Sequence, residues 1–341
     1  MTKVKLDLTR AQILAHRRNV QALDERLPQS PDFLRRAAWA GLQDSMPRAA
    51  LLSIHARVEG TGPNTWEDRS LVQLWGPRFS AYVVPRQDLA AFSLGRYPQS
   101  ASGVRRAEEI AERLEIFLEG RTTLSATEIG RGLGIHPNAL RYAAPTGRVL
   151  IRWDGARQPT VWTVPTPEVT VDDARKELAR RYLHVFGPGM PAAFAQWAGI
   201  KPPMGTAAFA ALDDELMPVR TPIGEGWILS QDEAEFSAQP GDGGPARLLP
   251  SGDTYFLLQG ADRDLLVPDA IRRRLLWTPR VWPGALLLGG EIVGTWRRAG
   301  PIVGIEPWRR LSSAERASVE EEAASLPLPG VDGSIIVRWH A

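Results

Sequence analysis

Residues 124–142 constrain the fold of this chain more narrowly than any other segment; they read Leu-Ser-Ala-Thr-Glu-Ile-Gly-Arg-Gly-Leu-Gly-Ile-His-Pro-Asn-Ala-Leu-Arg-Tyr. The pattern predicts a short helix that ends at Gly134, because glycine readily adopts the backbone that terminates helices. Ile135 supplies an apolar residue for the turn, and Pro137 is a favourable first residue for a second helix. This order of elements is typical of a helix-turn-helix.

The flanking residues extend this pattern to a winged helix. Residues 104–118 are predicted to form an amphipathic helix that precedes the helix-turn-helix. Residues 149–164 are predicted to form a hairpin whose turn is Asp154-Gly155. Three helices followed by a β-hairpin wing therefore account for residues 104–166.

The same order is predicted once before and once after this unit, and strands then dominate beyond the Gly- and Pro-rich residues 239–245. The elements expected before and after are helices at 11–23, 30–41 and 47–58 with strands within 71–84, then helices at 172–186, 191–198 and 206–216 with a hairpin at 217–229. Those expected in the C-terminal part are strands at 247–259, 285–288, 291–296 and 302–307, a helix at 312–325 and an edge strand at 333–338. We therefore predict an α+β fold of three tandem winged-helix modules followed by a β-rich, barrel-like C-terminal part. The predicted divisions are 1–103, 104–166, 167–238 and 246–341.

Charge is segregated along the chain. Only four of the 41 basic residues are lysine, and the net charge is +2. Residues 1–60 and 261–310 each carry a net +4 and residues 104–166 a net +2, whereas residues 167–260 carry a net −6. A genome that prefers arginine codons would explain the arginines, but segregation favours one basic face that binds phosphate. We expect the acidic third module to be a scaffold rather than the part that reads a nucleic acid.

Several classes of function are excluded or disfavoured by composition. The chain has no cysteine, which excludes disulfides, thiolate catalysis and cysteine metal sites. Its five histidines show no metal-ligand spacing, so we expect no metal and no organic cofactor. No apolar run approaches the roughly 20 residues of a membrane span, and the N-terminus has no signal-peptide core, so we expect a cytoplasmic protein.

Residues 39–57 place an amide and a carboxylate, Gln43 and Asp44, in the break between two apolar helices. Arginines surround this break, which indicates work on a phosphate-bearing ligand. The four arginines are Arg35, Arg36, Arg48 and Arg57.

This segment resembles the catalytic segment of the AlkZ/YcaQ-like DNA glycosylases, a winged-helix family that removes bulky alkylated purines. Residues 186–199, 247–253 and 294–298 also match the family in order, so the resemblance spans nearly the whole chain. The family signature has two polar residues that flank an apolar one. Here Gln43 matches the first polar position, Ser45 stands where Gln or Asp is expected, and Asp44 replaces the apolar residue.

The resemblance implies that Gln43 positions a water, that Asp44 assists charge stabilisation, and that Ser45 completes the catalytic set. An amide is a poor base, but it suffices when the leaving base is already activated, as a cationic N7-alkylguanine is. A structural alternative remains for Asp44 and Ser45, because either residue before Met-Pro-Arg is a good helix N-cap. On a helix, Asp44 would also point about 100° away from its neighbours.

Double-stranded DNA is the expected partner, and the candidate contacts lie in all the basic blocks. Trp39 and Trp75 are the candidates for stacking on a base, although most tryptophans here fit a core. His55 is expected to be a packed residue. The remaining candidate DNA-binding residues, besides the four arginines above, are Asn138, Arg141, Arg148, Arg152, Arg157, Arg272, Arg273, Arg274, Arg297 and Arg298.

The resemblance therefore implies a bacterial, monofunctional DNA glycosylase that hydrolyses the N-glycosidic bond of bulky N7-alkylated purines. The alternative is a non-catalytic DNA-binding protein or transcription regulator on the same scaffold, because the signature is incomplete. A third class, a winged-helix module that binds only protein, is less consistent with the separate basic blocks.

Overall fold

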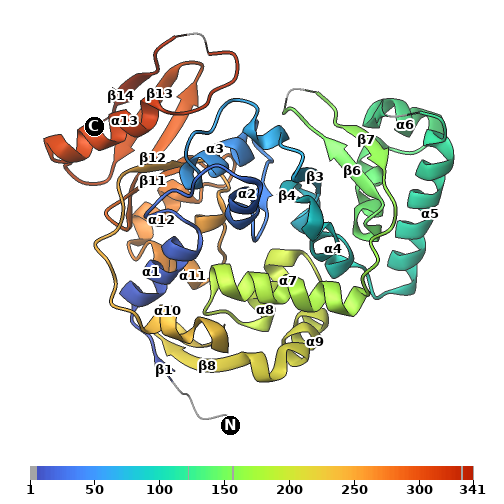
Figure 1. Ribbon diagram of the computed structural model, residues 1–341, viewed down its shortest axis with the longest axis horizontal. Helices are drawn as coiled ribbons and strands as arrows, with labels where there is room; N and C mark the ends of the chain where they lie inside the picture. The colour runs from blue at the N-terminus through green and yellow to red at the C-terminus, as the bar shows by residue number, and fades with distance from the viewer. Residues whose placement is uncertain (1–5, 122, 156, 332, 341) are drawn as a thin grey trace.

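The computed structural model describes residues 6–121, 123–155, 157–331 and 333–340, which form a mixed α+β fold with three sheets (Figure 1). The α-helices are α1 (Arg10–Val20), α2 (Pro31–Ala37), α3 (Ala49–Arg57), α4 (Leu89–Phe92), α5 (Ala101–Leu118), α6 (Ala126–Leu133), α7 (Val171–Phe186), α8 (Pro191–Ala198), α9 (Pro202–Leu212), α10 (Glu233–Ser237), α11 (Asp262–Leu266), α12 (Ala270–Leu276) and α13 (Ser313–Ala324). The strands are β1 (Leu6–Asp7), β2 (Leu42–Gln43), β3 (Leu71–Trp75), β4 (Ala81–Pro85), β5 (Leu124–Ser125), β6 (Val149–Arg152), β7 (Thr160–Thr163), β8 (Leu216–Thr221), β9 (Gly224–Leu229), β10 (Arg247–Leu249), β11 (Gly284–Leu288), β12 (Glu291–Ala299), β13 (Ile302–Pro307) and β14 (Ile336–Trp339). The short 3₁₀ helices are η1 (Thr65–Glu67), η2 (Pro77–Phe79), η3 (Arg86–Asp88), η4 (Leu94–Arg96), η5 (Pro137–Thr146), η6 (Asp213–Glu215), η7 (Ser230–Asp232) and η8 (Thr254–Phe256).

The element order of helices followed by a hairpin is present in each of the three predicted modules. Local signals explain why helix α6 of the second module forms as expected. The Ser125 side chain accepts a hydrogen bond from the Glu128 backbone while the Glu128 side chain reaches back, and Gly134 ends α6 with a φ of 65°. The helix expected from Pro137 is instead the 3₁₀ helix η5, which contains Pro145, a residue that cannot donate the hydrogen bond of a continuing α-helix.

The first and second predicted modules share one sheet. Its strand order is β2-β4-β3-β6-β7-β5, and β3 meets β6 through the pairing of Gln73 with Ile151. The β6–β7 wing therefore continues the sheet that carries β2. This continuity brings the wing close to residues 42–45.

The third predicted module follows the expectation with one shift. Its helices are α7, α8 and α9, and β8 pairs with β9 as a hairpin while β1 adds to β8 in parallel. The expected helix at 206–216 is α9, which begins at Pro202 and ends at Leu212, so the prediction of its bounds was wrong. Residues 213–215 form the short η6 instead.

The C-terminal part is an open sheet, so the barrel-like expectation was wrong. Among the described residues its strand order is β10-β11-β12-β13-β14, with β10 and β14 at the two edges. The strand expected over 247–259 is also shorter than predicted, because β10 ends at Leu249 and a turn leads into η8. Helices α11 and α12 were not predicted, and they precede the hairpin of β11 and β12.

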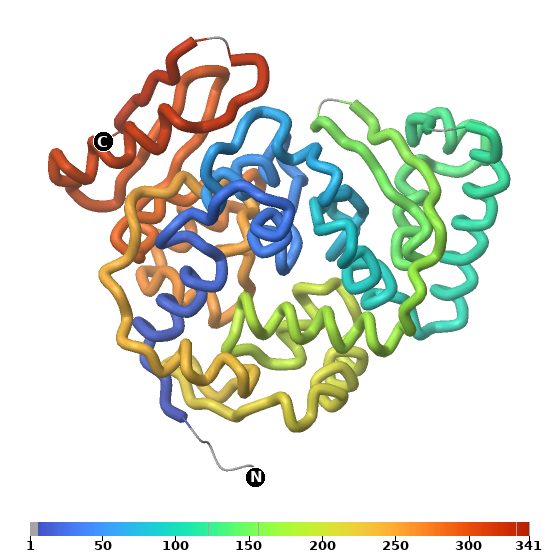
Figure 2. The backbone as a smooth tube through the Cα atoms, viewed as in Figure 1, coloured from blue at the N-terminus to red at the C-terminus, as the bar shows by residue number. Residues whose placement is uncertain are grey.

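Figure 2 follows the chain from residues 6–103 out to residues 104–166 on the right, back through α7–α10 along the bottom, and into the C-terminal sheet at the upper left. The last sheet returns to the N-terminal part, since α3 packs against β10. One apolar cluster contains Tyr82, Leu150, Leu178 and Phe256, so it joins all four of the predicted divisions. No helix among the described residues is long and apolar enough to cross a membrane.

Candidate functional site

The segment that carries Gln43 and Ser45 is extended rather than helical. Gln43 pairs with Tyr82 across β2 and β4, and the Asp44 backbone N–H donates to the Ala81 carbonyl at 2.8 Å. Successive side chains on a strand point to opposite faces. Gln43 and Ser45 are accordingly half-buried on one face, and the Gln43 Nε2 donates to the Ser45 Oγ at 3.0 Å.

Asp44 points to the opposite, buried face. Its Oδ1 accepts from the Ala50 backbone N–H at 3.0 Å, and its Oδ2 accepts from the Gln73 Nε2 at 2.7 Å. Burial raises the pKa of Asp44 to about 6, against the opposing effects of the Ala50 N–H, the Arg48 charge and Gln73. The N-cap residue of α3 is Arg48 rather than Asp44 or Ser45, but the Ala50 contact ties Asp44 to the first turn of this helix. Both contacts separate Asp44 from the other two predicted catalytic residues.

Arg78 and Gly252 complete the surroundings of Gln43. The Arg78 Nη2 lies 3.5 Å from the Gln43 Oε1, and its Nη1 donates to the Trp197 carbonyl at 2.9 Å. A Cβ on Gly252 would lie 3.5 Å from the Gln43 Cδ. Residues 247–253, which matched the family in sequence, therefore reach the candidate site across more than 200 positions of chain.

Arg57 is a structural residue, which corrects its assignment as a DNA contact. Its guanidinium is buried and makes two 2.8 Å bonds to the Asp253 carboxylate, with further bonds to the Ser53 carbonyl and the Gln21 side chain. A phosphate cannot reach it without unfolding this region. The pair instead fixes residues 250–253 against α3, beside Gln43.

A groove of about 250 Å³ begins one residue away from Ser45 and from Gly252. Arg297 and Arg298 on β12 lie on it, so two predicted phosphate contacts adjoin the candidate site. Other residues that line the groove are Met46, Pro47, Ser251, Trp282, Pro283 and Trp296.

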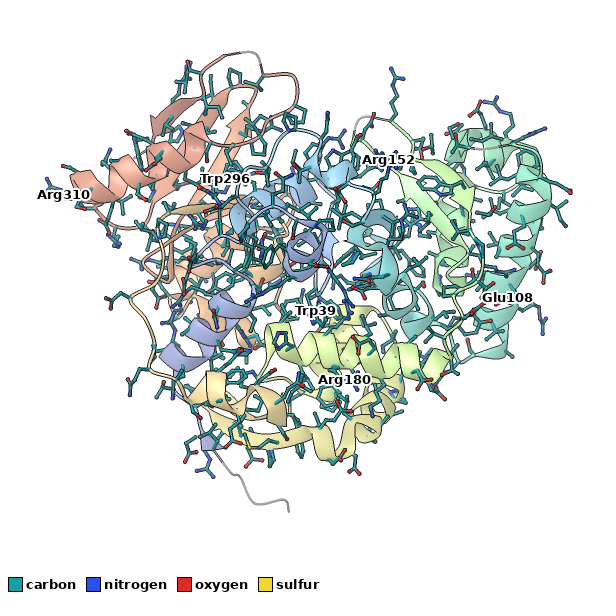
Figure 3. All side chains as sticks on the ribbon, viewed as in Figure 1. Trp39, Glu108, Arg152, Arg180, Trp296 and Arg310 are labelled. Atoms are coloured by element: carbon teal, nitrogen blue, oxygen red, sulfur yellow. The ribbon has the colours of Figure 1, made fainter. Side chains whose placement is uncertain are left out.

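Arg48 and Arg152 come from different predicted modules but converge on Trp66. Their guanidinium carbons lie 4.2 and 4.3 Å from the Trp66 ring centre, and Arg152 also pairs with Glu67 at 3.1 Å. Figure 3 labels Arg152 in the upper part of the view, near β6. The wing turn reaches the same region, because a Cβ on Gly155 would collide with Pro47.

Arg35 and Trp39 are already engaged within the fold. Arg35 makes two bonds to the Asp88 carboxylate, at 2.9 and 3.0 Å. The half-buried Trp39, labelled near the centre of Figure 3, has the guanidinium carbons of Arg35 and Arg181 at 5.1 and 4.1 Å from its ring. Both guanidinium groups therefore already lie against this ring. Arg36 is exposed.

The second stacking candidate, Trp75, is also half-buried. It packs against the apolar cluster of the second module, and its carbonyl accepts from the Arg96 guanidinium at 2.9 Å. Packing between modules therefore explains Trp75 without a ligand.

Some predicted DNA-binding residues of the second module are exposed, and others are paired with carboxylates. Asn138 is exposed, and Arg141 donates to its carbonyl at 2.8 Å. Arg148 is paired with Glu108 and with Glu115, so a phosphate would have to compete with two carboxylates for it. Arg157 is exposed on the wing.

Arg272, Arg273 and Arg274 lie on α12, whose first residues are capped by Asp269. Arg272 donates to the Trp308 carbonyl at 3.1 Å, and Arg273 pairs with Asp264 at 3.0 Å. Arg272 and Arg274 are exposed. This basic run therefore sits on a helical surface of the C-terminal part.

Sequence reasoning missed three residues around the site, namely Gln73, Arg78 and Asp253. One signal existed for Gln73, since it is the single amide within the otherwise apolar Leu71–Trp75. Asp253 lies in residues 247–253, which resemble the family, but no local pattern pointed to its pairing with Arg57, 196 positions away. Arg78 had no such signal, because its bond to the Trp197 carbonyl spans 119 positions.

The mixed α+β fold and the candidate site on β2 can now be compared with those of known proteins. Residues 36–327 match the family model described as DNA glycosylase AlkZ-like, so the chain belongs to the AlkZ-like DNA glycosylase family. Among solved structures, the Streptomyces sahachiroi DNA glycosylase AlkZ superimposes with a TM-score of 0.79 at 18% sequence identity, covering 98% of this chain and 100% of that one. At that identity the similarity shows the fold alone. No match was found among curated proteins.

Proposed function

We propose that this protein is a monofunctional DNA glycosylase that binds duplex DNA and hydrolyses the N-glycosidic bond of bulky N7-alkylated purines. Family membership supports the reaction class. The observation that carries the proposal is the half-buried Gln43 amide, whose Nε2 is held by Ser45. The Gln43 Oε1 accepts from the Arg78 Nη2 at 3.5 Å and keeps a second lone pair for a water.

Cleavage of this N-glycosidic bond requires little catalytic assistance from the protein. A cationic N7-alkylguanine is an activated leaving group, so the bond breaks with positive charge developing on the sugar. A carbonyl oxygen that holds a water beneath the sugar carbon needs only to orient it for attack. Because the Ser45 Oγ accepts from Gln43, its own O–H remains available to a phosphate or to that water.

The groove that contains Arg297 and Arg298 supports the choice of a DNA substrate. Guanidinium groups bind phosphate oxygens bidentately, and these two lie beside the segment that carries Gln43. The apolar residues of the same groove suit a bulky adduct. Such an adduct could be admitted without the full extrusion of the base that narrower glycosylases require.

Release of modified base from duplexes that contain a bulky N7-alkylguanine tests the proposal. Gln43→Ala should lower the rate by roughly 10²-fold or more, the scale of a positioned polar group, with DNA affinity nearly unchanged. Gln99→Ala is the matched control, because Gln99 is an exposed glutamine before α5. Ser45→Gln restores the family residue and should raise the rate. No base release by either the unaltered protein or Ser45→Gln, on any N7-alkylpurine tried, would refute the enzyme.

A non-catalytic DNA-binding protein on the same scaffold is the second candidate. The buried contacts of Asp44 favour it, because they place this carboxylate inside the fold rather than in the groove. Ser45, in place of the second signature residue, favours it as well. Tight duplex binding without base release would select this function.

A further inference from the structure

The side-chain amide of Gln43 has two orientations, which exchange its oxygen and its nitrogen. In the structure the Nε2 donates to the Ser45 Oγ at 3.0 Å, and the Oε1 faces Arg78. A hydroxyl both donates and accepts, so Ser45 would bond to either end of the amide. Ser45 therefore does not select the orientation on which the proposed chemistry depends.

Arg78 is the neighbour that distinguishes the two ends of this amide. A guanidinium offers only N–H donors. The Arg78 Nη2 lies 3.5 Å from the Gln43 Oε1, so a reversed amide would turn its NH2 group toward another donor. Among the described residues, the contacts with Ser45 and Arg78 are the hydrogen bonds of the Gln43 side chain. The selection therefore depends on Arg78.

The backbone that carries Arg78 is strained. Arg78 lies in the turn between β3 and β4, where its φ is 55° and the φ of Phe79 is 57°. Residues other than glycine rarely adopt this left-handed region. Strain of this kind persists only where the surrounding structure compensates it, and it is concentrated at functional sites. Here the strained turn places a guanidinium beside Gln43.

Contacts from the second and third modules hold this turn in place. The Arg78 Nη1 donates to the Trp197 carbonyl at 2.9 Å, in the last turn of α8. Gly199 follows that helix and packs so closely that a Cβ on it would lie 2.7 Å from the Arg78 backbone nitrogen. The Phe79 ring meets the Tyr142 ring edge-on, with centres 5.3 Å apart. One end of the Arg78 guanidinium is thus anchored, and the other end faces Gln43.

We propose that Arg78 is a positioning residue that fixes the orientation of the Gln43 amide. It holds the Oε1 so that the second lone pair of this oxygen accepts from a water, and it leaves the Nε2 to donate to Ser45. The kinetic consequence rests on the proposed glycosylase function, because the water matters only if base is released. The orientation itself does not rest on that function, since it is measured without a substrate.

NMR of the full-length protein labelled with isotopic glutamine tests the orientation. The Gln43 side-chain signals are those absent from Gln43→Ala. Ser45→Ala removes the acceptor of the Nε2, so one Gln43 Nε2–H signal should move upfield. In an Arg78→Glu background the new carboxylate accepts from the Nε2 and reverses the amide, so Ser45→Ala should then cause no such shift. A Gln43 Nε2–H signal that ignores Ser45→Ala in the otherwise unaltered protein would overturn the proposal.

Single-turnover base release at saturating protein tests the kinetic consequence, because it separates the rate from DNA affinity. Arg78→Met lets both orientations coexist, so the rate should fall about 2-fold with the competent fraction. Arg78→Glu should lower the rate by roughly 10-fold or more, because a charged acceptor favours the reversed amide. Arg78→Lys keeps a donor and should retain most of the rate.

Two comparisons separate this role from a purely structural one. Arg86→Met is the matched control, because Arg86 is an exposed arginine directly after β4, and its rate should not change. In a Gln43→Ala background the residual rate should not depend on the residue at position 78. Losses in Arg78→Met and Arg78→Glu that persist in that background would overturn the proposal.

Failure of the glycosylase proposal remains distinguishable from failure of this one. Absence of base release by the unaltered protein would refute the enzyme, and the NMR response to Ser45→Ala would still decide whether Arg78 orients the amide. Base release that is equal in Arg78→Lys, Arg78→Met and Arg78→Glu would leave the enzyme intact and refute the positioning role.

Discussion

Asp44 is the residue whose role depends most on its exact partners. Its two oxygens accept from the Ala50 N–H and the Gln73 Nε2, and the Gln73 Oε1 in turn accepts from the Trp153 N–H at 2.6 Å. Asp44→Asn would turn a donor toward the Gln73 donor and should cost about 1–3 kcal/mol. A simple N-cap would tolerate Asn, so Gln73 makes the difference.

Reversing the direction of the hydrogen bond between positions 44 and 73 should restore the stability that Asp44→Asn loses. In Asp44→Asn combined with Gln73→Glu, the new carboxylate accepts both from Asn at position 44 and from the Trp153 N–H. We expect the double variant to be more stable than either single variant, with a coupling of about 2 kcal/mol in urea unfolding. If its base release also returns to the level of the unaltered protein, Asp44 acts only within the fold. A persistent loss of excision at restored stability would assign the carboxylate to the chemistry.

The raised pKa of Asp44 predicts a dependence of stability on pH. The folded chain keeps the Asp44 proton up to about pH 6, whereas the unfolded chain releases it near 3.8, so unfolding releases a proton in between. Stability should therefore fall as pH rises from about 4 to 6, by about 3 kcal/mol from this residue. Urea unfolding of the unaltered protein and Asp44→Asn across this range isolates the effect, because other titrations cancel in the difference. A difference that does not change with pH would contradict the burial of a titrating carboxyl.

At the scale of elements, the contact between α3 and residues 250–253 supports the candidate site. Arg57 and Asp253 are both buried, and two hydrogen bonds join their side chains. Removal of one partner leaves an uncompensated buried charge, so Arg57→Met should lower the free energy of unfolding by about 3–5 kcal/mol. Urea unfolding measures this loss.

Arg36→Met is the control for that experiment, because Arg36 is an exposed arginine on the neighbouring α2. Its stability should change by no more than about 0.5 kcal/mol. If Arg57→Met instead weakened DNA binding without a loss of stability, the internal role of Arg57 would be wrong.

At the scale of the whole molecule, the basic blocks predict that DNA binding is mainly electrostatic. Affinity for duplex DNA should fall steeply between ~50 and ~200 mM salt as bound counterions are released. Simultaneous replacement of Arg272, Arg273 and Arg274 by Ala should reduce the slope of log affinity against log salt. Fluorescence anisotropy with a labelled duplex provides the measurement.

Arg180→Ala is the matched control for the salt experiment. Arg180 lies on α7 in the acidic part of the chain, where Glu177 and Glu215 pair with it, and Figure 3 labels it there. The slope should not change in this variant. An affinity for duplex DNA that does not change with salt concentration would refute a phosphate-binding face.

The sequence alone determined the elements whose signals are local. Helix α8 has the predicted bounds 191–198, because Pro191 opens it and Gly199 closes it with a φ of 70°. The capping residues of α6 and the glycine turn between β11 and β12 were equally readable. Along the site, the sequence singled out Gln43 as a candidate catalytic residue, and this role stays a prediction.

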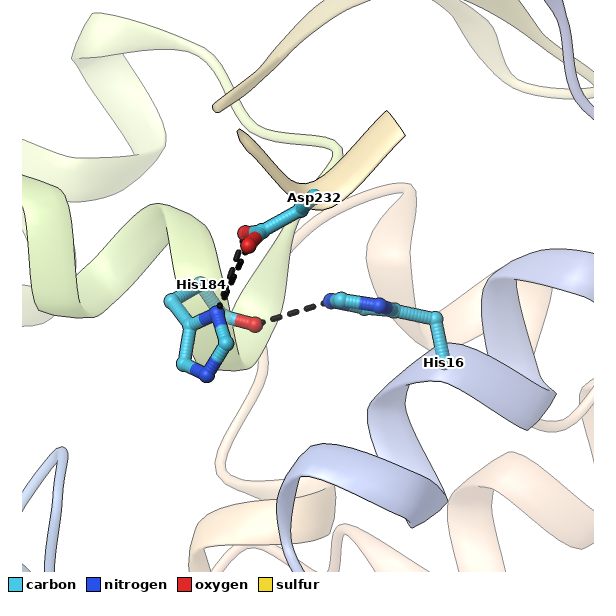
Figure 4. Close-up of side chains that lie close together, drawn as sticks. All are labelled: His16, His184 and Asp232. Carbon is cyan, nitrogen blue, oxygen red and sulfur yellow. Dashed lines mark hydrogen bonds and ion pairs between the residues drawn. The ribbon is translucent and has the colours of Figure 1, made fainter. Parts of the chain in front are cut away.

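Tertiary structure decided everything that depends on partners distant in the chain. The pairing of β2 with β4 makes residues 42–45 extended, and this alone separates Asp44 from Gln43 and Ser45. The buried charge of Arg57 is compensated by Asp253, 196 positions away, which no local pattern predicts. The hydrogen bond between His184 and Asp232 (Figure 4) likewise spans 48 positions, so no sequence spacing reveals it. Local backbone preferences act over a few residues, whereas burial and charge compensation are settled only when the chain has closed on itself.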